Sequence, residues 1–289
     1  MNIDDLNRYP GWTSRAEVLR ERIDVQRVQA LAATLDLPMD FDHGTPLPAG
    51  WQWLFFNPVA PRSELATDGH SRRDTSGSFL PPVPLPRRMW AGSRIRYLRD
   101  VPIGGDASRT SRILKLANKE GRAGKLCFVT VEHRLDVRVE DCIVEEQDIV
   151  YREASSSASS ASPAAPAAPV EFSNRITADS ALLFRYSALT FNGHRIHYDK
   201  PYACDVEGYS NLVVHGPLSA TLLQNFARAC LPERRLAGFE FKGVSPLFVD
   251  ETFELQAWIE AADKNQLTMR VINAHGGLAM QANARLESR

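Results

Sequence analysis

The richest concentration of proton-handling side chains in this sequence lies within residues 186–203. Asn192, His194, His197 and Asp199 stand there within a few positions of one another, beside the end of a predicted helix. Imidazole, amide and carboxylate groups next to apolar sequence are the residue types that a water-activating site requires. The segment therefore predicts acid–base chemistry.

A second feature follows at His215-Gly216-Pro217, where an apolar strand runs into an apolar helical pattern over residues 218–229. The first N–H groups of a helix have no partner within it, and glycine lets another group approach the backbone closely. The Gly216 amide can therefore hold a carbonyl oxygen that becomes negative during a reaction. A simpler interpretation, that Gly-Pro only starts the helix, is compatible with this one.

Composition excludes several classes of function. The chain has 289 residues, and its 34 basic and 35 acidic residues give a formal charge of −1, which argues against a protein built to bind nucleic acid or an anionic membrane. No apolar run approaches the ~20 residues of a membrane span, and the N-terminus is polar. The four cysteines show no CxxC spacing, so we expect free thiols and a cytoplasmic location.

The sequence divides into two similar halves. Residues 154–169 are all Ala, Ser or Pro, a composition typical of a linker. We therefore expect an N-terminal repeat over 1–153, a linker over 154–170 and a C-terminal repeat over 171–289.

Each half begins with a helical run, for which Asp24 and Thr177 are the expected N-caps. Pro102 and Pro246 then stand at matching places, as do Asp106 and Asp250. Alternating patterns follow, over 111–116, 126–135 and 142–151 in the first half and over 252–261, 267–274 and 278–286 in the second. One helix and several antiparallel strands per half predict an α+β class.

The run Leu189-Thr-Phe-Asn-Gly-His-Arg-Ile-His197 resembles the motif Leu-Ser-Gly-Asp-x-Asn-Pro-Leu-His of the MaoC-like hydratases and dehydratases. With His215-Gly216 and the duplication, the chain is most similar to the double hot-dog subgroup, which includes 3-hydroxyacyl-thioester dehydratases and mesaconyl- or itaconyl-CoA hydratases. The resemblance implies a double hot-dog fold, in which each repeat wraps a curved antiparallel sheet around a central helix. It also implies a hydro-lyase without a dissociable cofactor.

The resemblance further implies roles for three residues. His197 would move a proton between water and substrate, Asn192 would position the water, and the Gly216 amide would stabilise an enolate. Asn192 stands where the motif has its catalytic aspartate, and an amide cannot take up a proton as a carboxylate does. Simpler interpretations stay open, since Asn192 could only form a turn and His197 could only bind a backbone carbonyl. Asp199 could orient His197 or cap the turn before Pro201.

Further residues are candidates for binding the substrate: His194, Arg195, His215, Arg87, Arg88 and Trp90. The guanidinium groups of Arg87 and Arg88 match phosphate geometry, although both could equally be solvated, and Trp90 could contact an acyl or pantetheine arm. For a distal carboxylate on the acyl group, Arg195 or Arg185 are the candidates. Two histidines three residues apart invite a metal, but no third ligand has a matching spacing, so we expect none.

In the first half, counting from the helix places His43 at the position of His197, which we interpret as coincidence. We therefore expect one active site per chain, with the first half enlarging the substrate tunnel. The expected partner is an acyl-CoA, with an acyl carrier protein thioester as the other option, and homo-oligomers are common in this fold. The alternatives are an acyl-CoA thioesterase and a non-catalytic acyl-CoA-binding protein.

Overall fold

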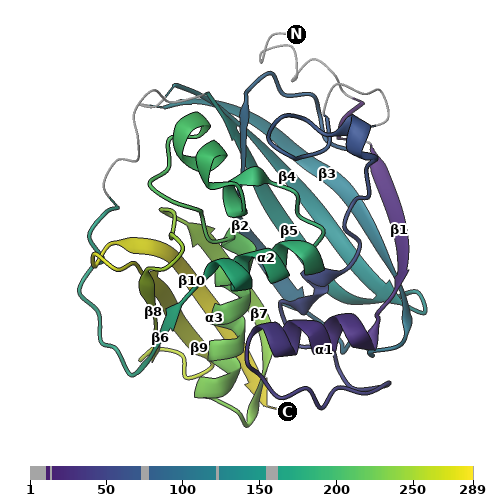
Figure 1. The fold of residues 1–289 in the computed structure, drawn as a ribbon. Coiled ribbons are helices and arrows are strands. Elements are labelled where there is room, and N and C mark those ends of the chain that lie inside the picture. Colours follow the sequence, from purple (N-terminus) through teal and green to yellow (C-terminus); the bar gives the residue numbers. More distant parts are fainter. Residues whose placement is uncertain (1–10, 14, 73–77, 122–123, 154–161, 289) are drawn as a thin grey trace.

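The computed structural model describes residues 11–13, 15–72, 78–121, 124–153 and 162–288. A single ten-stranded antiparallel sheet runs through it, in the order β1-β3-β4-β5-β2-β7-β10-β9-β8-β6. From each edge of the sheet inward, the strands follow the same order: β1-β3-β4-β5-β2 in one half and β6-β8-β9-β10-β7 in the other. The two halves meet where β2 pairs with β7 (Figure 1). The α+β class and the internal duplication are therefore confirmed. Of the predicted linker, residues 154–161 lie outside the described residues.

The elements of the two halves follow the same order along the chain, except for one additional helix, α3, in the second half. The first half contains β1 (Ala16–Arg22), α1 (Val25–Thr34), the 3-10 turns η2 (Trp51–Leu54) and η3 (Arg62–Glu64), β2 (Arg87–Tyr97), β3 (Asp106–Gly121), β4 (Gly124–Val137) and β5 (Glu140–Arg152). The second contains β6 (Phe172–Thr177), α2 (Ser180–Leu189), η4 (Arg195–His197), η5 (Tyr202–Val206), α3 (Gly216–Cys230), β7 (Arg234–Gly243), β8 (Thr252–Ile259), β9 (Gln266–Ile272) and β10 (Leu278–Ser288).

One predicted detail of the repeat is wrong by two residues. Asp179, and not Thr177, caps α2: its side chain accepts a hydrogen bond from the Leu182 N–H at 2.7 Å, as Asp24 does for Arg27 in α1. Thr177 is instead the last residue of β6, and its hydroxyl bonds that of Thr252 across the strand pair. A β-branched residue is favoured in a strand, and the Thr177 hydroxyl already has a partner on the neighbouring strand. Thr177 therefore stays in β6 and does not cap the helix.

The expectation of a central helix in each repeat is correct for the second half only, because the described part of the first half has no counterpart of α3. In the second half, α3 begins directly after an isolated bridge between Val213 and Phe248, and it packs against β7 to β10. In the first half, the matching bridge joins Pro46 to Pro102, and the chain then makes only the short turn η2. In Figure 1, α3 covers the second half of the sheet, while α1 and α2 lie side by side. The inner face of the first half is thereby left open for a cavity.

Hydrophobic side chains from both halves form one continuous core, and a smaller core lies within the first half. All four cysteines are free, as predicted; Cys127 and Cys142 are buried, whereas Cys204 and Cys230 are partly exposed. Within the described ranges, every helix is too short or too polar to cross a membrane.

Candidate active site

The segment with the predicted catalytic residues is a tight turn that follows α2. Phe191 adopts a positive φ of 50°, and the Asn192 Oδ1 accepts a hydrogen bond from the His194 N–H at 3.0 Å. The 3-10 turn η4 follows and carries the His197 ring inward. Asn192 thus forms the turn that its sequence predicts, and its amide also borders the cavity described below.

His197 is held in one defined tautomer. Its side chain is 7% exposed, and its Nδ1 lies 2.7 Å from the carbonyl oxygen of Val213. Because a carbonyl can only accept, Nδ1 must carry the proton, and Nε2 keeps a free lone pair. A fixed imidazole with a free Nε2 is the arrangement of a general base.

Two further histidines pack around this ring. The ring of His215 stacks on that of His197 with centroids 3.6 Å apart, and its Nε2 lies 2.8 Å from the Ser187 hydroxyl. His215 is fully buried and lies outside the residues that line the cavity, so it faces His197 and not the substrate space. His194, on the other side, lies 5.5 Å from His197 between ring centroids, and it does line the cavity.

Burial sets the charge of this histidine group. It lowers the pKa of His197 to about 4, and it lowers those of His194 and His215 as well. Neighbouring imidazoles add to the shift for His194 and His215, because each would repel a second positive charge. His197 is therefore neutral at pH 7, so the lone pair of its Nε2 is available to a water molecule.

The lowered pKa values predict that stability falls in acid. As pH drops through 6.5, the unfolded chain protonates His197 while the folded protein resists until about pH 4. Protons then favour the unfolded state, and by pH 4 this residue alone costs about 3 kcal/mol. We expect urea unfolding between pH 7 and 4 to show this loss, and a His197→Gln variant to lose less over the same window. Equal pH dependence in the two proteins would contradict the assignment.

Gly216 lies at the start of α3, on the same cavity as His197. The cavity has a volume of about 2020 Å³ and extends from these residues to the inner face of the first half. A Cβ placed on Gly216 would meet no atom within 4 Å, so the space in front of this residue is open. The free helix N–H groups and the helix dipole therefore point toward a place where a thioester oxygen can sit.

The other predicted residues divide into two groups. Arg87, Arg88 and Trp90 line the cavity, and Arg87 is held there by Glu207, whose backbone oxygen accepts its hydrogen bond at 2.9 Å. The Trp90 indole donates to the Ser93 hydroxyl at 2.9 Å, which fixes the ring.

Arg195, by contrast, lies outside the residues that line the cavity and is occupied by Asp199, with nitrogen–oxygen distances of 2.7 and 2.9 Å. Asp199 also accepts a hydrogen bond from the Tyr202 N–H at 3.1 Å. It therefore caps the following turn, which is the second of the two roles that the sequence left open.

Sequence reasoning missed three residues that the first half contributes to this cavity: Asp68, His70 and Arg109. Asp68, His70 and His194 also place possible ligand atoms within 4.8 Å of one another, a grouping that could hold a metal ion. The only local signal was Asp68-Gly69, a common turn pair. Nothing in the local sequence says that this turn reaches the second half.

Solved structures of other proteins share this architecture. A MaoC-like dehydratase superposes with a TM-score of 0.72 at 12% identity, covering 96% of this chain and 98% of the other. HtdX of Mycobacterium tuberculosis gives a TM-score of 0.64 at 17% identity, covering 94% and 99%. The fold is therefore the double hot-dog of the MaoC-like class, as the sequence resemblance implied.

Sequence comparison narrows the class. The model of the family "hydroxyacyl-thioester dehydratase type 2" matches residues 50–249, a range that includes Asp68, His197 and Gly216. Mesaconyl-C(4)-CoA hydratase of Chloroflexus aurantiacus is 42% identical over 278 residues, which cover 96% of this chain and 97% of that protein. The mitochondrial type 2 hydroxyacyl-thioester dehydratase of Schizosaccharomyces pombe is 27% identical, with 73% and 77% covered. The chain belongs to this dehydratase family, and it is a hydro-lyase.

Proposed function

We propose that this enzyme adds water reversibly to the double bond of an α,β-unsaturated acyl-CoA whose acyl group also carries a carboxylate. The observation that supports the reaction is a neutral, oriented imidazole, that of His197, on the same cavity as the N-terminus of α3. The relative at 42% identity, whose name gives mesaconyl-C(4)-CoA as its substrate, supports the acyl class.

The reaction follows from these groups. His197 Nε2 takes a proton from water as the water oxygen bonds to the β-carbon, and the electrons of the double bond move toward the thioester oxygen. The Gly216 N–H, with the helix dipole behind it, stabilises the enolate that forms. Protonation of the α-carbon completes the addition. The Asn192 amide would hold the water, while Arg88 and the Trp90 ring offer contacts to the CoA arm.

A carboxylate on the acyl group needs a cation inside the cavity. Arg185 is exposed and lies outside the cavity lining, and Arg195 is bound to Asp199, so neither of the candidates from the sequence is available. Arg109 of β3 lines the cavity, and its Nε has no hydrogen-bond partner among the described residues. Its guanidinium lies over the Phe56 ring at 5.6 Å, which holds it in place.

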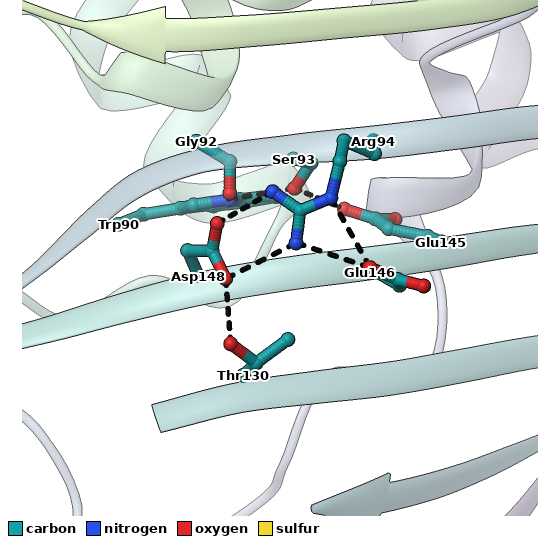
Figure 2. A network of polar contacts seen from close by, with 8 residues as sticks. All are labelled: Trp90, Gly92, Ser93, Arg94, Thr130, Glu145, Glu146 and Asp148. Atoms are coloured by element: carbon teal, nitrogen blue, oxygen red, sulfur yellow. Dashed lines mark hydrogen bonds and ion pairs between the residues drawn. The ribbon is translucent and has the colours of Figure 1, made fainter. Parts of the chain in front are cut away.

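The electrostatics of Arg109 also favour an anionic ligand. Burial lowers its pKa, although the nearby carboxylates Glu145, Glu17 and Glu21 act in the opposite direction. Glu145 is itself held by other donors, since Ser93 Oγ donates to it at 2.7 Å and the Trp53 indole at 3.0 Å (the Ser93 contact is drawn in Figure 2). The positive charge of the guanidinium is therefore only partly balanced. A carboxylate bound to its N–H groups through two parallel hydrogen bonds would complete the balance.

Replacing Arg109 should change substrate preference more than overall activity. Hydrogen bonds to charged groups contribute roughly 1.5–3 kcal/mol, so Arg109→Gln should lower kcat/KM for mesaconyl-C4-CoA about 10- to 100-fold. Activity with crotonyl-CoA, which lacks the carboxylate, should change little. Arg112→Gln, an exposed position on the other face of β3, is the matched control. An equal loss with both substrates would remove Arg109 from this role.

The first test of the function is a panel of thioesters with the purified enzyme. We expect the enoyl absorbance of mesaconyl- or crotonyl-CoA to fall without release of free thiol. Thiol release alone would indicate the thioesterase alternative, and binding without turnover would indicate an acyl-CoA-binding protein. The same panel with acyl carrier protein thioesters distinguishes the two carriers. The cytoplasmic location and homo-oligomer formation remain predictions from the sequence.

A further inference from the structure

A short loop of the first half closes over the catalytic loop of the second. A bridge between Leu65 and Ser71 shapes this loop, and its Asp68 backbone oxygen accepts a hydrogen bond from the Arg195 N–H at 2.9 Å. Gly69 has φ of +89°, and a Cβ there would lie 1.9 Å from the Gly193 oxygen. Only glycine fits so close an approach, so the loop is built to dock at this place.

The docked loop carries a hydrogen-bonded carboxylate–imidazole pair. Asp68 Oδ2 lies 2.9 Å from His70 Nδ1, and Asp68 Oδ1 accepts the His70 backbone N–H at 3.0 Å. Both residues line the cavity that holds His197 and Gly216. The His70 ring lies 4.2 Å from that of His194, which in turn lies 5.5 Å from His197. An Asp-oriented histidine thus faces the same space as the proposed base.

Hydration requires two proton transfers, one from water at the β-carbon and one to the α-carbon. His197 provides for the first. Where the family motif has a carboxylate that could share this work, the chain has Asn192, whose amide cannot act as an acid or a base in the way that a carboxyl group does. The catalytic turn has one other imidazole on the cavity, that of His194, but among the described residues no hydrogen bond orients its ring. A second oriented proton-handling group is therefore missing from the turn itself.

We propose that His70, oriented by Asp68, is the second catalytic acid–base group, and that it exchanges the proton at the α-carbon. In hydration, protonated His70 gives its proton to the α-carbon of the enolate as the C–H bond forms, while His197 holds the proton taken from water. The two imidazoles then return to their starting states through solvent. In dehydration, neutral His70 removes the α-proton, and His197 protonates the departing hydroxyl. This step rests on the proposed function.

The electrostatics of Asp68 and His197 fit these two roles. Burial would raise the pKa of Asp68, but its hydrogen bond with His70 and the charge of that ring lower it well below the ordinary value. Burial is the main cause of the lowered pKa values of His197 and His194. The charge of His70 lowers both values further, and the charge of Arg88 also lowers the pKa of His194. The Asp68 carboxylate is thus ionised beside His70, whereas His197 is neutral.

The experiment follows exchange of α-hydrogen for deuterium in butyryl-CoA, which has neither a double bond nor a hydroxyl to eliminate. Exchange in deuterated water needs an α-base and the enolate site, but no group at the β-carbon. We expect His197→Gln to retain exchange near the wild-type rate and His70→Gln to lose at least about tenfold, which matches the contribution of a general base. His43→Gln, at an exposed histidine of the same half outside the cavity lining, is the matched control.

Asp68 is a positioning residue, and its test needs a readout that loss of structure would not move. In Asp68→Asn, loss of the negative charge favours the neutral ring of His70. Exchange should be slower and should persist to lower pH than in the wild type. A lower rate with an unmoved pH profile would make Asp68 purely structural.

The outcomes separate this inference from the proposed function. A wild-type enzyme that neither hydrates enoyl thioesters nor exchanges the α-hydrogen would remove both. Normal hydration, with exchange retained in His70→Gln and lost in His197→Gln, would overturn only the role of His70. A stoichiometric divalent metal that His70→Gln fails to hold would likewise overturn it, and would assign Asp68, His70 and His194 as ligands.

Discussion

His197→Gln should lower kcat/KM for enoyl-CoA hydration by about 10³- to 10⁴-fold, at the upper end of what a positioned general base contributes. The wild-type Nε2 lone pair faces the cavity because Nδ1 is committed to the Val213 carbonyl. Glutamine can still donate a hydrogen bond to that carbonyl, but it offers no basic nitrogen to water. The effect should fall on kcat more than on KM, since the lost interaction belongs to the transition state. Steady-state kinetics by loss of enoyl absorbance measure both.

A fold control is needed because His197 also packs on His215. Circular dichroism and thermal unfolding of His197→Gln at pH 7 should remain close to those of the wild type. His275→Gln replaces an exposed histidine in a turn between β9 and β10 and should leave the kinetics unchanged. A folded His197→Gln enzyme with near-normal kcat would exclude this residue as the base.

Gly216→Ala should reduce activity without reducing stability. The added Cβ meets no atom within 4 Å and stands at the start of α3, where alanine is a better helix former than glycine. Its methyl group, however, enters the space in which the thioester oxygen must approach the backbone N–H. Loss of one such donor costs about 10²- to 10³-fold in kcat, so we expect a decrease of that order.

Thermal unfolding and kcat together test the role of Gly216. Thermal unfolding should show a melting temperature equal to or above that of the wild type, while kcat with crotonyl-CoA falls. Gly276→Ala, in an exposed turn with positive φ, provides the opposite control, because it should lower stability and leave kcat unchanged. Full activity in Gly216→Ala would show that the thioester does not approach this amide.

The sequence was sufficient for features that depend on local pattern. The turn at Asn192, the inward histidine at 197 and the helix beginning at Gly216 are encoded within short stretches, and all three border one cavity. The duplication was also visible, although its register was two residues off at Thr177, because a threonine and an aspartate two positions apart are both good caps.

The contributions of the first half could not be predicted, because each depends on contacts between segments distant in sequence. The Asp68 loop reaches the catalytic turn through contacts such as Gly69 against Gly193 and the backbone bond to Arg195. In the sequence, Arg109 looks like one more outward-facing arginine of a charged strand. Its pairing with Leu135 of β4 places it on the inner face of the sheet. The absence of a long helix after Gly50, in the described part of the first half, opens that face.

The central claim is that water is added to the β-carbon of an acyl thioester that itself stays intact. Incubation of the enzyme with mesaconyl-C4-CoA in water labelled with oxygen-18, followed by mass spectrometry, tests this most directly. We predict one heavy oxygen in the new hydroxyl group of an unbroken CoA thioester. Heavy oxygen in a released carboxylate, together with free CoA, would contradict the claim.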